Sequence, residues 1–337
     1  MTGIRHPRTR LTLTALLAAL LAICTMTTAF LTAPAQAAGS VTIRPESLPR
    51  GAEVRGAHLA SAGSKTIIDG DVKVTVRGDY VHLFGKSGTS YVVYVVRGQV
   101  SSVVRVGPGG SERVVAADAG VGGPRLASDG GLLAVTRSAN ATRTKIDVIK
   151  VSTGRTVLSR TFSGAKSVLD IRGSRAILAS GGSGVLGTYS WNLSTGRSTL
   201  LTRRSGSAAD LRTGLLATYD KDPYDGGCSI LTTIAQPSKT LWRSCSERVG
   251  SFSPDGRRIS TLYILSDSLG PAVVHTRSIH GYLLASYKVD GGYSAGESWE
   301  SDKVLLLGAY GHDKAATVRC TGSTCVRATA LADVPTY

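Results

Sequence analysis

The chain has 337 residues, with 18% charged residues, 6% aromatic residues and a formal net charge of +16 at pH 7. About 300 residues remain after the first segment, more than one simple core usually needs, although a repeat fold can use them as a single domain. No later stretch approaches roughly 18 consecutive apolar residues, which excludes a further membrane-spanning helix.

The first segment has the features of a secretory signal peptide. It begins with three arginines and no acidic residue, continues with a mostly apolar stretch over residues 11–31, and ends in Ala35-Gln36-Ala37. We therefore predict that residues 1–37 are removed after Ala37 and that the mature protein is secreted or lies in the cell envelope. An uncleaved membrane anchor is the alternative, although threonines interrupt the apolar run.

A strand–turn–strand unit recurs along the rest of the chain. Residues 38–50 are predicted to be an irregular lead-in, and residues 51–337 to form the repeat domain. In each unit a tight turn precedes a strand rich in Val, Ile, Leu and Tyr, as strands buried on both faces should be. The turn positions are separated by 42, 43, 41, 42 and 46 residues: Gly88, Gly130, Gly173, Gly214, Gly256 and Asp302.

Each unit also contains a second hairpin, so the period of about 42 residues holds four short strands and no helical pattern. This combination is typical of a propeller blade. The sequence predicts an all-β fold, a β-propeller with seven four-stranded blades, of which residues 51–77 form an incomplete one. Six blades, or a sandwich of two or three all-β domains, are the alternatives.

The cysteines agree with this repeat. Cys24 leaves with the signal peptide, and four cysteines remain, which allow three pairings. Cys228 and Cys245 lie symmetrically about one predicted hairpin turn, and Cys320 and Cys325 lie symmetrically about another. Opposed residues of an antiparallel hairpin are close enough for a disulfide, so we predict Cys228–Cys245 and Cys320–Cys325.

The segment Phe252-Ser253-Pro254-Asp255-Gly256 resembles the repeat of the TolB-like and WD-repeat-like propeller families, in which such a phrase joins the first two strands of a blade. The other blades match by period alone. The resemblance implies a propeller that binds partners, and it carries over no functional residue. Only about 40 residues precede the repeats, so the N-terminal α/β domain of TolB has no counterpart, which puts a TolB-type translocation role in doubt.

Two loops are candidate ligand sites. Three carboxylates in a glycine-containing loop could bind calcium, namely Asp220, Asp222 and Asp225, although no glutamate follows at the usual distance; no other cofactor is expected. Five basic residues could form an anion-binding rim, or simply a solvated surface: Arg137, Arg143, Lys145, Arg203 and Arg204. Aromatic residues are not interleaved with them, which argues against nucleic acid.

Catalysis would require an acid and a base near the central channel. Six carboxylates fall at inner or connecting positions of the predicted blades: Asp118, Asp170, Asp210, Glu247, Glu297 and Glu300. They do not distinguish a pair, so a hydrolase or lyase acting on an extracellular polymer stays the alternative. We predict instead an exported, monomeric binding or scaffold module that recognises a protein or an anionic envelope polymer through loops on one face.

Overall fold

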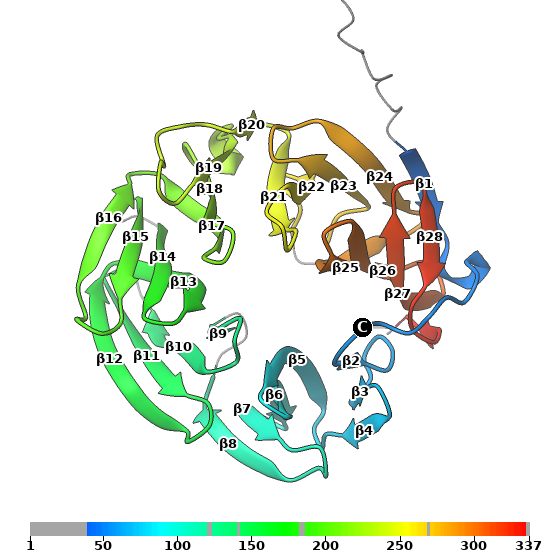
Figure 1. Cartoon of the computed structure of the whole chain (residues 1–337), viewed down its shortest axis with the longest axis horizontal. Coiled ribbons are helices and arrows are strands. Elements are labelled where there is room, and N and C mark those ends of the chain that lie inside the picture. The colour runs from blue at the N-terminus through cyan, green and yellow to red at the C-terminus, as the bar shows by residue number, and fades with distance from the viewer. Residues whose placement is uncertain (1–38, 120–122, 140–141, 182–185, 268–269, 335–337) are drawn as a thin grey trace, which may run out of the picture. The chain divides into compact units, whose positions relative to one another are not determined.

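The computed structural model describes residues 39–119, 123–139, 142–181, 186–267 and 270–334, and they include seven β-sheets arranged as blades of a ring (Figure 1). Each blade is a meander of consecutive antiparallel strands, with the first strand nearest the centre of the ring. The prediction of a seven-bladed β-propeller is confirmed. The predicted signal peptide, residues 1–37, lies outside the described residues.

The first three blades follow one another along the chain. Blade 1 has three strands, as expected for the incomplete unit: β2 (His58–Leu59), β3 (Thr66–Asp69) and β4 (Val72–Thr75). Blade 2 contains β5 (Tyr80–Ser87), β6 (Ser90–Arg97), β7 (Val100–Val106) and β8 (Glu112–Ala117). Blade 3 contains β9 (Pro124–Leu126), β10 (Leu132–Ala139), β11 (Arg143–Lys150) and β12 (Arg155–Ser163).

Blades 4 to 7 each have at least four strands. Blade 4 contains β13 (Ala165–Arg172), β14 (Arg175–Gly181), β15 (Gly187–Asn192) and β16 (Ser198–Thr202). Blade 5 contains β17 (Ser205–Asp210), β18 (Leu215–Tyr219), the 3-10 turn η2 (Pro223–Asp225), β19 (Ser229–Thr233) and β20 (Trp242–Ser244). Blade 6 contains β21 (Glu247–Phe252), β22 (Arg258–Tyr263), β23 (Val273–Ser278) and β24 (Leu283–Val289). Blade 7 contains β25 (Tyr293–Ser301), β26 (Val304–Tyr310), β27 (Lys314–Thr321) and β28 (Thr324–Arg327), with β29 (Ala332–Asp333) paired to β27.

The apolar second strands form the core between blades. The first six residues of β6 are all buried, because Val and Tyr side chains on both faces of this strand pack against neighbouring sheets. Outer strands are half exposed, as in β12, where buried and exposed residues mix. No helix of the described residues is long and apolar enough to cross a membrane.

The turn at Ser253–Gly256 shows how the first hairpin of a blade is built. The N–H of Gly256 donates to the carbonyl of Ser253 at 2.9 Å, and the Ser253 hydroxyl donates to Asp255 Oδ1 at 2.7 Å. Gly256 has a φ of 67° and lies against Thr213 of blade 5, where a Cβ would come within 2.8 Å. A side chain is therefore excluded both by the backbone conformation and by the neighbouring blade.

Of the segment 38–50, which we expected to be irregular, residues 39–50 are instead ordered against the far end of the chain. The strand β1 (Gly39–Ile43) adds to the outer edge of blade 6 by pairing in parallel with β24. Ile43 is fully buried there, because alternate residues of the strand point into the core shared by blades 6 and 7. The 3-10 turn η1 (Pro45–Ser47) follows. We call residues 39–55 the N-terminal strap.

A buried ion pair of blade 7 holds the end of the strap. Arg319 on β27 binds Glu300 on β25 through Nε at 2.7 Å and through Nη2 at 2.6 Å. The same guanidinium donates to the carbonyls of Ala52 and Glu53 at 2.6 and 2.8 Å, and Glu300 accepts from the N–H of Arg55 at 2.8 Å. The pair therefore connects blade 7 to the segment that enters blade 1.

Replacing Arg319 by alanine tests this contact. The Glu300 side chain is only 6% exposed, so the variant leaves a buried carboxylate without its cation. We expect the free energy of unfolding to fall by about 3–5 kcal/mol in chemical denaturation. Arg44→Ala is the matched control, because Arg44 pairs with Asp290 while 62% exposed; it should cost no more than about 1 kcal/mol. Equal losses in the two variants would contradict the assignment.

Candidate functional site

The first strands of blades 3 to 6 end around a cavity of about 350 Å³. It lies on the face of the ring that carries the hairpin turns, and we call it the channel-mouth cavity. Its polar lining includes two arginines, two aspartates and three serines: Arg125, Arg212, Asp170, Asp210, Ser128, Ser207 and Ser251.

β-Bulges place part of this lining. In three blades the first strand contains residues that have no partner in the ladder with the second strand. These residues are Leu169 in β13, Ser207 in β17, and Gly250 and Ser251 in β21. All four of these residues line the cavity. A bulge leaves a residue outside the ladder and redirects the strand, so the irregularities of three neighbouring blades build one wall.

The two aspartates of the cavity are engaged by backbone N–H groups. Asp170 accepts from Ile171 at 2.8 Å and from Leu211, on the turn of the next blade, at 2.6 Å. Burial nevertheless raises the pKa of Asp170. Asp210 accepts from the N–H groups of Arg212 and Thr213 at 2.7 and 3.2 Å, and its other oxygen pairs with the Arg212 side chain at 3.2 Å. Both carboxylates stabilise turns.

Three of the other predicted carboxylates also do not form an acid–base pair. Burial alone would raise the pKa of Glu247, but hydrogen bonds from Arg277 and Thr261 lower it. Glu300 is held by Arg319, whose hydrogen bonds lower its pKa. Asp118 is exposed, in a connection between blades where its φ is 48°.

Glu297 behaves differently, because a hydroxyl rather than a cation contacts it. It reaches from blade 7 into blade 6, where Gly250 leaves room: a Cβ on Gly250 would come within 1.8 Å of Glu297 Oε1. The Ser260 hydroxyl donates to that oxygen at 3.2 Å, and Glu297 forms no ion pair with a described residue. Burial raises the pKa of Glu297.

A second cavity, of about 500 Å³, lies where β21 begins, and a histidine and a glutamate both line it. Glu247 and His275 both line it, together with the exposed ring of Tyr263. Burial lowers the pKa of His275. The Glu247 carboxylate, however, is bound by Arg277 through Nε at 2.8 Å and through Nη2 at 2.5 Å, so it serves a structural ion pair.

Basic side chains without an ion-pair partner gather on the hairpin-turn face of blades 3 and 4. All are exposed, and none forms an ion pair with a residue that the structure describes. We call them the basic track: Lys150, Arg155, Arg172, Arg175 and Arg197. No sequence motif singled out this set, although four of the five residues flank glycine turns of the repeat, at RGSR and TGR.

The predicted anion-binding rim is only partly available. Arg137 pairs with Asp147 at 3.1 Å and also donates to the carbonyl of Ala117, and Arg204 donates to the carbonyl of Pro237. These two residues are therefore structural. Lys145 and Arg203 are exposed; Arg143 is exposed too and has an interaction of its own. The rim belongs to the opposite face, at the loops between second and third strands and between blades.

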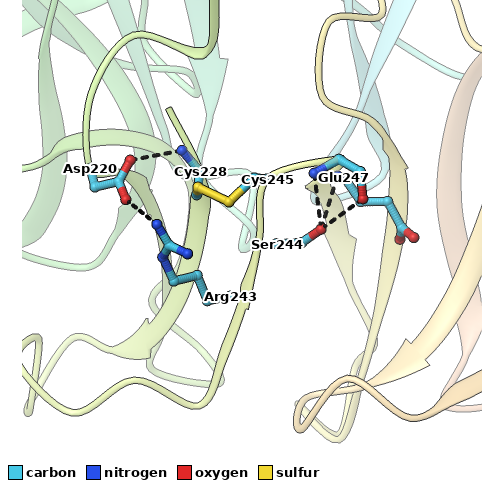
Figure 2. The surroundings of a disulfide bond; sticks show 7 residues. Asp220, Cys228, Arg243, Ser244, Cys245 and Glu247 are labelled. Carbon is cyan, nitrogen blue, oxygen red and sulfur yellow. Dashed lines mark hydrogen bonds and ion pairs between the residues drawn. A yellow bond between two sulfur atoms is a disulfide. The ribbon is translucent and has the colours of Figure 1, made fainter. Parts of the chain in front are cut away.

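The predicted calcium loop is instead occupied by its own contacts, as Figure 2 shows around the nearby disulfide. Asp220 accepts from the N–H of Cys228 at 2.7 Å and pairs with Arg243 at 2.9 Å. Asp222 caps η2 by accepting from the N–H of Tyr224 at 2.9 Å. Within the described part of the chain, no three His, Cys, Asp or Glu side chains are grouped for a metal, so this geometry gives calcium no support.

Both predicted cysteine pairs lie at disulfide distance. The sulfurs of Cys228 and Cys245 are 1.97 Å apart, and those of Cys320 and Cys325 are 2.03 Å apart. Each pair joins the third and fourth strands of one blade, as the repeat predicted.

Comparison with known proteins shows the fold alone. No protein-family model and no curated protein matches the sequence, whereas 266 chains of solved structures are similar. The β-propeller domain of the Trilobed protease from Pyrococcus furiosus is 9% identical, with 79% of this chain and 86% of that chain covered and a TM-score of 0.58. Acylaminoacyl peptidase from Pyrococcus horikoshii is 10% identical, with 81% and 48% covered and a TM-score of 0.54.

TolB from Acinetobacter baumannii is also similar in structure, at 17% identity and a TM-score of 0.45. The match covers 67% of this chain and 61% of TolB. This chain thus spans about half of the peptidase and less than two thirds of TolB. The predicted resemblance to a β-propeller family is confirmed at the level of the fold by the propeller domain of the Trilobed protease.

Glu297→Gln tests the buried carboxyl beside the channel-mouth cavity. A raised pKa in the folded protein means that its stabilising effect is present at low pH and is lost as pH rises through that pKa. Glutamine keeps the acceptor for Ser260 without acquiring a charge. We expect the variant to match the wild type in stability at about pH 4 and to exceed it at about pH 8, measured by urea denaturation. A variant that is less stable than the wild type at the higher pH would contradict the raised pKa of Glu297.

Proposed function

We propose that this protein is an exported, non-catalytic β-propeller that binds a linear anionic polymer of the cell envelope or its surroundings. The observation that carries the proposal is the basic track, five exposed cations on one face of a rigid ring that pair with no carboxylate among the described residues. Exposed positive charges on a fixed surface attract polyanions, and binding is favoured because the counterions condensed on the polyanion are released.

Three further features support the proposal. The sequence has a signal-peptide pattern, and disulfides are typical of proteins in oxidising compartments. The carboxylates of the channel-mouth cavity are engaged by backbone N–H groups, which is unlike a reacting acid and base. The turns that carry the track contain no aromatic residue, so base stacking, which single-stranded nucleic acids require, is not offered there.

Binding to linear polyphosphate, with neutral dextran as the comparison, tests this function. We expect retention on immobilised polyphosphate that disappears as salt is added, and no retention on dextran. The triple variant Arg172→Gln, Arg175→Gln and Arg197→Gln should lower the slope of log affinity against log salt by about 2, since each lost phosphate contact removes about 0.7.

The control variant has the same net charge and alters the opposite face. Lys145, Arg203 and Lys221 are exposed, and their replacement by glutamine should leave the salt slope unchanged. Equal effects of the two triple variants would mean that net charge, not the track, governs binding. Salt-independent retention, or none, would reject the polymer-binding function.

A further inference from the structure

The basic track runs radially, from the outer rim of the ring toward its centre. In blade 4 the inner turn, between β13 and β14, carries Arg172 and Arg175, and the outer turn, between β15 and β16, carries Arg197. The N–H of Leu193 donates to the carbonyl of Ser174 at 2.8 Å, which fixes the two turns side by side. Lys150 and Arg155 lie on the outer turn of blade 3.

The inner end of the track meets the channel-mouth cavity. The bond from the Leu211 N–H to Asp170 joins the inner turns of blades 4 and 5, and it brings Arg212 beside the turn that holds Arg172. Arg125 lines the cavity from blade 3. Two guanidinium groups thus border a cavity whose walls also offer hydroxyls, and guanidinium groups bind phosphate through paired hydrogen bonds.

The track does not continue beyond the cavity. The described residues on the turns of blades 1 and 7 include Asp69, Asp71 and Asp302 beside the exposed Lys303, and Lys86 on the adjoining turn of blade 2 is paired with Asp69 at 2.6 Å. A polyanion that crossed the centre of the ring would therefore pass from a row of cations to turns on which carboxylates lie among the cations. The charge pattern favours a chain that stops at the cavity.

We propose that the channel-mouth cavity receives the terminal phosphate of a linear phosphate-bearing polymer, while the following units lie along the basic track. This inference rests on the proposed polymer binding and adds that recognition is end-on. A volume of about 350 Å³ accommodates a single terminal unit, and Arg125, which pairs with no described carboxylate, supplies its positive charge, since Arg212 already pairs with Asp210. The carboxylates of Asp170 and Asp210 face the same cavity, and their backbone and Arg212 contacts offset their charge.

The number of proteins bound to each polymer chain distinguishes end-on from lateral binding. The probe is linear inorganic polyphosphate in a short and a long form, with stoichiometry measured by analytical ultracentrifugation. End-on recognition predicts at most one protein per chain end, at either length. A stoichiometry that grows with chain length would overturn this inference and leave the proposed function intact, whereas no binding at either length would overturn both.

Two variants and one modified probe complete the test. Arg125→Gln should weaken binding to short polyphosphate about tenfold, the effect of losing one hydrogen bond to a charged group. The matched control is Arg257→Gln on the inner turn of blade 6, an exposed arginine outside the cavity and the track, which should bind as the wild type does.

Polyphosphate with both terminal phosphates capped as phosphoramidates should bind the wild-type protein as weakly as the uncapped polymer binds Arg125→Gln. Unaltered binding of the capped polymer, or of Arg125→Gln, would reject the terminal-phosphate pocket.

Discussion

The N-terminal strap fastens the last sheet of the ring to the segment that enters the first sheet. The Arg319–Glu300 pair is central to this attachment, because the pair binds the strap backbone while being shielded from water. Within the described residues the blades are built from consecutive strands, and the strap contacts the last strand of blade 7 through the parallel bridge between Arg50 and Arg327. The strap, by pairing with blade 6 and crossing blade 7, links three blades at once.

The two faces of the ring differ because the hairpins and the longer connections lie at opposite ends of the strands. Turns between paired strands are short, and their conformation is fixed by glycine and by hydrogen bonds such as those of Ser253 and Asp255. Charged residues beside these turns are therefore held at defined positions. This rigidity is what allows a row of cations to act as a binding surface without paying for loop ordering.

Local patterns in the sequence were sufficient to predict the blades but not to predict the candidate site. The period, the glycine turns and the symmetric placement of Cys228 and Cys245 depend on neighbouring residues, so the architecture and the disulfides could be predicted. The docking of β1 on blade 6 could not, because it pairs residues almost 250 positions apart. The bulge that places Ser207 in the cavity wall depends on contacts between strands, and so does the ion pair between Arg137 and Asp147. The spacing of residues along the sequence does not reveal these contacts.

The position of the strap has a consequence for the order of folding. Its partners, β24 and β27, are among the last strands of the chain, so a polypeptide that emerges from its N-terminus must hold the strap unpaired until nearly the whole repeat is present. Blades can form one at a time from local contacts, but closure has a high contact order and a large loop entropy. The strap can therefore dock only after blades 6 and 7 have formed.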